Sequence, residues 1–156
     1  MKNELDTLKS KDRNIAFYAY LTNDMVNSTE GLTMVFSGVE TNVGNAYDPL
    51  HGSFVAPISG TYHFIFSATC QPGSNRHMLH IHLKKSSVGK NQMYLFLDWN
   101  TDIWLQRTTS SVLHLNQGER VWMEIGIASG PNTIAGYRPG DDASHTHFSG
   151  FLIHAD

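Results

Sequence analysis

The sequence predicts an all-β protein, a jelly-roll β-sandwich of about ten short strands. Short stretches in which apolar and polar residues alternate recur along the chain, and clusters of Gly, Pro, Asn and Asp separate them. The body of the chain contains no segment with the periodicity of an amphipathic helix. Regularly spaced strands with turn signals between them are typical of a sandwich or jelly roll.

The first residues differ in character from all that follow. Residues 1–14 are rich in charge, and Leu5 and Leu8 lie three positions apart, as in a helical turn. We expect a short N-terminal linker or the remnant of a coiled coil here, and a disordered linker is the alternative. Residues 15–156 are expected to form one globular domain, because the chain of 156 residues is too short for two ordinary ones.

The expected strands follow in order from Ile15. Their alternating patterns cover residues 15–21, 60–70, 76–85, 93–97, 103–115, 121–127 and 146–154, and short strands joined by tight turns fill residues 36–56. Residues 22–33 are expected to be a loop with little structure, and residues 71–75 and 86–91 are expected to be turns.

The strand after Gly60 carries the clearest core pattern. Tyr62, Phe64 and Phe66 occupy every second position, so all three should point into one core. Cys70 is in phase with them and is expected to be a buried thiol that packs as a small hydrophobe. As the single cysteine, it excludes a disulfide within the chain.

Composition argues against several classes of function. The net charge is −3, so the protein lacks the basic field that drives binding to nucleic acids or anionic membranes. No apolar run approaches the roughly 20 residues of a membrane span, and residues 1–10 lack the apolar core of a signal peptide. Only 16% of the residues are charged, which suits an extracellular β-module with subunit interfaces. No catalytic motif is found, and we expect no enzyme.

A fixed spacing of aromatic and polar residues carries a family resemblance. It comprises Phe36, Asn42, Tyr47, Phe54, Gly60, Tyr62, Phe64 and Phe66, and residues 52–57, 113–122 and 148–153 extend it. This pattern resembles the signature of the complement C1q globular head domain over residues 15–154. The resemblance implies a ten-stranded jelly roll similar to tumour necrosis factor ligands, assembly as a homotrimer, secretion and ligand recognition outside the cell. No Gly-X-Y collagen repeat precedes it, so the chain looks more like the stalkless or short coiled-coil, lectin-like members.

The long segment 130–145 is the first candidate binding site. Tyr137, Arg138, Asp141, Asp142 and His145 lie close together in it. An aromatic face, a guanidinium and carboxylates are the groups that bind sugars and acidic glycans. The alternative is a solvated loop whose charges pair locally. The two adjacent carboxylates could instead hold calcium, although two are too few alone.

Residues 98–104 form the second candidate loop. Asp98 and Trp99, with Trp104, could form a platform for a sugar, or the tryptophans could fill core or interface. His80 and His82 share one strand face and could bind zinc with a third ligand, although outward polar positions are the simpler interpretation. Nine histidines could make binding or assembly sensitive to pH.

These features lead to one function and one alternative. We expect a secreted, trimeric, innate-immune recognition protein that binds carbohydrate or other surface patterns on microbes or cells. A protein ligand or synaptic-type organiser that engages a receptor is the alternative. Tyr18, Tyr20, Phe151 and Ile153 are the candidates for the trimer contact.

Overall fold

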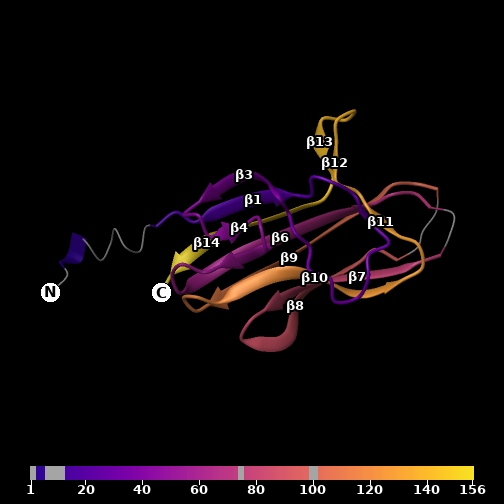
Figure 1. Ribbon diagram of the computed structural model, residues 1–156. Coiled ribbons are helices and arrows are strands. Elements are labelled where there is room, and N and C mark those ends of the chain that lie inside the picture. Colours follow the sequence, from indigo (N-terminus) through magenta and orange to yellow (C-terminus); the bar gives the residue numbers. More distant parts are fainter. Residues whose placement is uncertain (1–2, 6–12, 74–75, 99–101) are drawn as a thin grey trace.

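Two antiparallel β-sheets pack face to face in the computed structural model (Figure 1). The structure describes residues 3–5, 13–73, 76–98 and 102–156, so most of the expected N-terminal linker, residues 1–2 and 6–12, lies outside the described residues. The described part contains fourteen strand segments, of which several are only two residues long. The prediction of an all-β jelly roll is confirmed.

The first sheet has the order β2-β11-β6-β14-β1-β3, and β9 pairs with β6 along its full length. Its strands are β1 (Ala16–Tyr20), β2 (Met25–Val26), β3 (Gly38–Val43), β6 (Gly60–Cys70), β9 (Leu105–Leu115), β11 (Thr133–Ile134) and β14 (His147–Ala155). The second sheet has the order β4-β5-β10-β7-β8. Its strands are β4 (Tyr47–Asp48), β5 (Ser53–Val55), β7 (Met78–Lys85), β8 (Val88–Phe96) and β10 (Arg120–Ser129), and β12 (Tyr137–Arg138) pairs with β13 (Ala143–Ser144) as a separate hairpin.

Two expected loops are shorter than the sequence indicated. The turn expected over residues 86–91 is tighter, because β8 already begins at Val88, which pairs with Lys85. The polar start of β8 is tolerated because this strand is the last in the order of its sheet and exposes that stretch to solvent. The loop expected over residues 22–33 contains β2, which pairs with β11.

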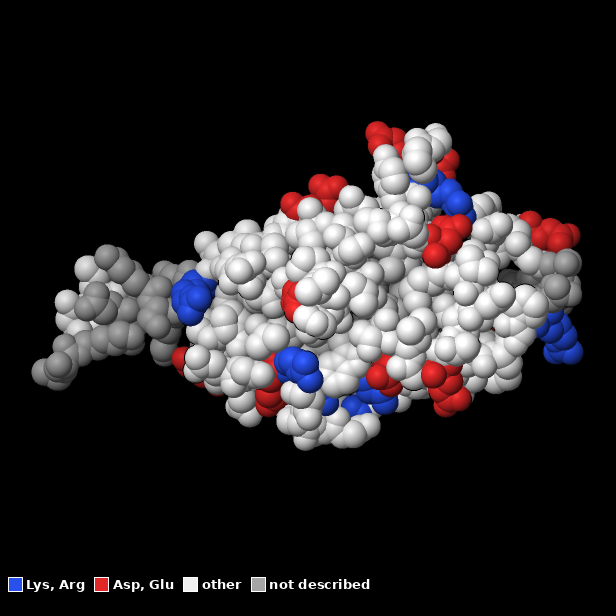
Figure 2. All heavy atoms as spheres, viewed as in Figure 1, with Lys and Arg blue, Asp and Glu red and all other residues white. Residues whose placement is uncertain are grey.

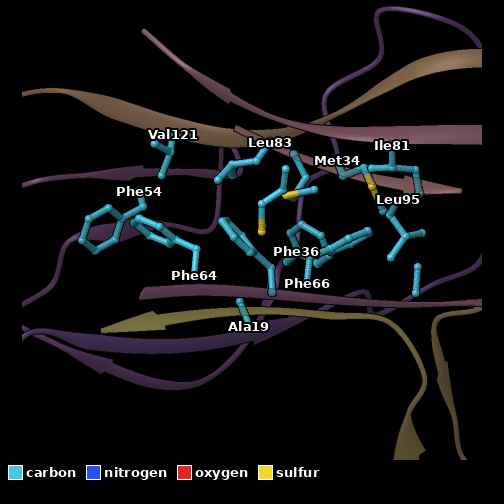
Figure 3. Close-up of a cluster of buried hydrophobic side chains, with 14 of the residues drawn as sticks. Ala19, Met34, Phe36, Phe54, Phe64, Phe66, Ile81, Leu83, Leu95 and Val121 are labelled. Atoms are coloured by element: carbon cyan, nitrogen blue, oxygen red, sulfur yellow. The ribbon is translucent and has the colours of Figure 1, made fainter. Parts of the chain in front are cut away.

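The core lies between the two sheets, as Figure 3 shows. Tyr62, Phe64 and Phe66 are fully buried, which confirms the predicted facing of β6. Phe17 of β1 stacks on Tyr47 with ring centroids 4.9 Å apart. Aliphatic residues of the second sheet, among them Ile81, Leu83 and Val121, close the core from the opposite side (Figure 3). Such interdigitation of side chains from two inner faces is how a sandwich buries its apolar surface.

The spacing of Phe36, Asn42 and Tyr47 has a structural cause. The Asn42 side chain donates to the Tyr47 carbonyl at 2.9 Å and accepts from the Tyr47 amide at 3.2 Å. The Tyr47 hydroxyl donates to the Phe36 carbonyl at 2.8 Å and accepts from the Phe36 amide at 3.1 Å. Burial raises the pKa of Tyr47, so its hydroxyl stays protonated as a donor. These landmark residues therefore build the scaffold.

Cys70, at the end of β6, is a buried free thiol. Its Sγ donates to the Gln71 carbonyl at 3.7 Å, and burial raises the pKa of the thiol. A raised pKa disfavours the thiolate, which is the reactive form of cysteine. The prediction that Cys70 packs as a small hydrophobe is confirmed.

The outer face of the first sheet carries no formal charge over three rows of residues on β9, β6, β14 and β1. The register places three rows of four residues there: Val112, His63, Phe151 and Ala16; Ser110, Ile65, Ser149 and Tyr18; Thr108, Ser67, His147 and Tyr20. None of them is Lys, Arg, Asp or Glu. Phe151 is 42% exposed and Val112 is 60% exposed, so apolar surface remains uncovered on this face of the single chain. We call these rows the neutral face.

Candidate functional site

The β12–β13 hairpin projects from the body of the sandwich (Figure 1). It is anchored on the chain that leaves β1: the Tyr137 amide donates to the Leu21 carbonyl at 2.8 Å, and the Gly136 amide donates to Asp24 Oδ1 at 2.9 Å. A Cβ at position 136 would collide with the backbone of Asn23, so only glycine permits this close approach. The hairpin therefore has a fixed base.

The tip of the hairpin is a tight turn. The amides of Asp141 and Asp142 donate to the carbonyls of Arg138 and Pro139 at 3.1 Å and 3.2 Å. Asp142 has a φ of 48°, in the left-handed region that Asp tolerates better than most residues. This turn brings the two adjacent carboxylates to the tip but gives them different directions.

Each carboxylate of the tip has its own partner. The Tyr137 hydroxyl donates to Asp142 Oδ1 at 2.8 Å, and His145 Nε2 lies 2.8 Å from Asp141 Oδ2. The hydrogen bond to the Asp142 carboxylate raises the pKa of Tyr137, because it holds the phenolic proton. The side chain of Asp141 is still 59% exposed, so its remaining acceptor sites face solvent.

Arg138 connects the hairpin to the sandwich. Its Nη2 donates to Asp24 Oδ2 at 3.0 Å and to Gln71 Oε1 at 3.3 Å. Its guanidinium lies 5.2 Å from the centroid of the Trp104 ring, which in turn stacks against His145 with centroids 6.1 Å apart. The Trp104 side chain is half exposed, so one aromatic surface stays open beside the hairpin.

The structure brings together most of the predicted site, but not all of it. Tyr137, Arg138, Asp141, Asp142 and His145 gather in the hairpin, and Trp104 joins them from the second candidate loop. Asp98 lies apart: it accepts from the Leu79 amide at 3.1 Å and pairs with His80 Nε2 at 2.9 Å. Trp99 lies outside the described residues.

Two neighbours of Arg138 were missed in the sequence. Asp24 stands in a polar loop without any motif, and Gln71 was assigned only to a turn. Both are far from Arg138 along the chain, so no spacing pattern could have joined them to it.

The two hairpin carboxylates supply few of the ligands that calcium takes, and calcium at this site stays a prediction. Calcium takes six to eight oxygen ligands, whereas Asp141 and Asp142 turn to different partners. Within residues 3–5, 13–73, 76–98 and 102–156, no group of three or more His, Cys, Asp or Glu side chains is placed to hold a metal ion. The same holds for the zinc site considered at His80 and His82, since His80 is taken by Asp98 and Tyr94.

The surface around the hairpin combines both signs of charge with open aromatic rings. Figure 2 shows acidic and basic side chains together on the hairpin and its base, and mostly uncharged atoms over the body on this side. Aromatic faces, carboxylate oxygens and a guanidinium at one place can stack against a ring and exchange hydrogen bonds with hydroxyl groups. Among the described residues, no helix is long and apolar enough to span a membrane.

Two antiparallel sheets in this order, closed over one aromatic core, define a jelly-roll β-sandwich. Residues 16–153 match the C1q domain family, and the chain belongs to that family. The prediction of a C1q-like domain is confirmed.

Known proteins agree with this assignment. The chain is 33% identical over 149 residues to human complement C1q tumor necrosis factor-related protein 3, a match that covers 89% of this chain and 51% of the relative. The chain thus spans about half the length of that relative. The globular domain of zebrafish complement 1qA protein superposes with a TM-score of 0.65 at 22% identity, over 92% of this chain and 99% of the other. The Eiger TNF structure from S. frugiperda also superposes with a TM-score of 0.65, at 8% identity, over 92% and 95% of the two chains, so it shares the fold alone.

Proposed function

We propose that this protein is a secreted, homotrimeric recognition protein that binds carbohydrate or other surface patterns through the β12–β13 hairpin and its surroundings. A role in innate immunity agrees with relatives named as complement C1q proteins. The observation that carries the proposal is the cluster of Tyr137, Arg138, Asp141 and Trp104, which gives one projecting element an aromatic surface, a cation and exposed carboxylate oxygens. We expect binding without catalysis.

The neutral face supports the trimer. Subunit interfaces are depleted of charged residues at their centre and enriched in aromatic residues. The neutral face has these properties, with Tyr18, Tyr20 and Phe151 among its residues. Ile153, which follows on β14, is 51% exposed and extends the apolar surface. Three copies of one weak site would bind a repetitive surface with useful avidity.

The shape of the site favours a large partner. Small-molecule sites are usually concave, whereas the hairpin projects from the body (Figure 1). A projecting element can reach the exposed sugars of a polymer or a cell surface. The same shape also suits the alternative function, in which the hairpin binds a receptor protein.

A glycan array probed with the full chain tests the proposal, with and without calcium. We expect binding to a subset of glycans that Arg138→Ala weakens. Arg120→Ala is the matched control, because Arg120 also lies over a tryptophan, 5.7 Å from the Trp122 ring, but on the second sheet. Binding that persists in Arg138→Ala would place the site elsewhere. An array without any signal, together with capture of one specific membrane protein, would favour the receptor-binding alternative.

A further inference from the structure

The outer face of the second sheet carries a cluster of imidazole and aromatic rings that the hairpin does not use. It consists of His80 and His82 on β7 and of Tyr94 and Phe96 on the neighbouring β8. The His82 and Tyr94 centroids are 4.4 Å apart, and those of His80 and Phe96 are 4.6 Å apart. Both histidines are buried although they point away from the core. We call these four residues the imidazole cluster.

His80 is fully partnered within this cluster. Its Nδ1 lies 2.7 Å from the Tyr94 hydroxyl, and its Nε2 lies 2.9 Å from Asp98 Oδ1. The Tyr94 hydroxyl is therefore hydrogen-bonded to His80 and does not bond to His82.

His82 is the opposite case. Neither of its ring nitrogens has a hydrogen-bond partner, and both are buried. The ring lies over Gly126, where a Cβ would collide with it, and the register of β10 shifts at this place between Ile125 and Ile127. The His82 ring thus packs, as a neutral imidazole, between Gly126 at the bulge of β10 and the ring of Tyr94.

The charges that face His82 give little support to a protonated ring. On its own strand Lys84 and His80 oppose the charge, and on β10 only Glu124, at the paired position, favours it. Glu124 already accepts from Trp122 Nε1 at 3.3 Å. On β8, Tyr94 covers the ring with its aromatic face. The pKa of His82 accordingly lies below its ordinary value, with burial as the largest cause.

We propose that His82 is an acid-sensitive latch that holds the edge strand β8 on the second sheet. The neutral ring stays seated between Tyr94 and Gly126. Once protonated, the ring needs acceptors that this site lacks, so it leaves for solvent, and Tyr94 loses one of the three rings that it packs against. Strand β8 follows β7 at the end of the sheet order, so this loosening has to open only one ladder of hydrogen bonds. The latch is independent of the ligand proposed for the hairpin.

Amide hydrogen exchange of the wild-type protein tests the latch. Protection of Val88–Phe96 is compared with that of β3, which also ends the order of its sheet and contains no histidine. The comparison is made at about pH 7.5 and about pH 5.5, on either side of the ordinary histidine range, after correction for the intrinsic pH dependence of exchange. We expect protection of β8 to fall by up to about tenfold more than that of β3, because a released imidazole with the ordinary pKa near 6.5 is protonated over neutral by about ten to one at pH 5.5. Equal protection of β8 at both pH values would overturn the latch.

Three variants sharpen this test. His82→Phe keeps a planar ring but removes the titration, so β8 should respond no more than β3. Gly126→Ala displaces the ring at every pH, so β8 should be weakly protected even near neutrality. His114→Phe is the control, since His114 is an exposed partner of Asp156 on the other sheet, and it should keep the wild-type response. A pH response that survives in His82→Phe, or a normal β8 in Gly126→Ala, would contradict the latch.

A direct titration covers the case in which a variant fails to fold. The ring protons of His82 and Tyr94 are followed by NMR in the wild-type protein. Signals of Tyr94 should shift in step with the protonation of His82, below the ordinary histidine pKa. An ordinary titration of His82 with unchanged Tyr94 signals would refute the latch.

Discussion

Substitution of Arg138 distinguishes a residue that stabilises the fold from one that binds ligand. Its guanidinium reaches Asp24 at 3.0 Å, Gln71 at 3.3 Å and the Trp104 ring at 5.2 Å. The Arg138 and Asp24 side chains are 31% and 26% exposed, so solvent still screens the pair. Partly exposed ion pairs contribute about 0.2–1 kcal/mol and an exposed cation–π contact about 0.5–1 kcal/mol. We therefore expect Arg138→Ala to lower the free energy of unfolding by about 1 kcal/mol.

Urea denaturation and thermal unfolding measure this change. For a chain of this length, 1 kcal/mol corresponds to a Tm lowered by about 2–4 °C. A double-mutant cycle with Asp24→Ala should return a coupling of about 0.2–1 kcal/mol between the two side chains. Arg120→Ala serves again as the matched control for loss of an arginine from a tryptophan face.

Binding is measured in parallel on the same variants. We expect Arg138→Ala to lose ligand binding well beyond what its small loss of stability explains. If Arg138→Ala lowers the free energy of unfolding by more than about 3 kcal/mol, the pair behaves as a buried one. In that event the hairpin is scaffold and Arg138 is wrongly assigned to the site.

The other predictions address the core, pH and assembly. Phe64→Ala should lower the free energy of unfolding by about 3–5 kcal/mol, because it empties part of a fully buried site; an unchanged Tm would mean that β6 faces the other way. Burial lowers the pKa of His147 below that of the unfolded chain, near 6.5. The folded state then binds this proton less readily, so stability should be full above about pH 6.5 and should decline as the pH falls toward the folded pKa. In His147→Phe the free energy of unfolding should depend less steeply on pH. An unchanged slope would exclude His147 as a source of the pH dependence. Phe151→Arg places a charge on the neutral face and should give a folded monomer in analytical ultracentrifugation. The control Leu50→Arg, in the turn between β4 and β5, should remain a trimer. If both variants are trimers, the interface lies on another surface.

Local patterns were enough to predict the strands that face the core. Side chains in a strand alternate between two faces, so the aromatic series at Tyr62, Phe64 and Phe66 determined which side of β6 is buried. The bounds of β8 were harder to predict, because Lys90 and Asn91 resemble a turn and only their place at a sheet edge allows them to be a strand.

The composition of the candidate site could be predicted from the sequence, but its contacts could not. The sequence by itself determined that residues 137–145 combine an aromatic ring, a guanidinium and two carboxylates, and that a C1q-like scaffold carries them. Only the tertiary structure decided that Arg138 is held by Asp24 and Trp104, that Asp98 belongs to His80, and that the adjacent carboxylates turn to different partners. Alternation along a strand is a local property of the backbone, whereas these contacts depend on how distant segments meet after folding, and no short-range pattern in the chain records that.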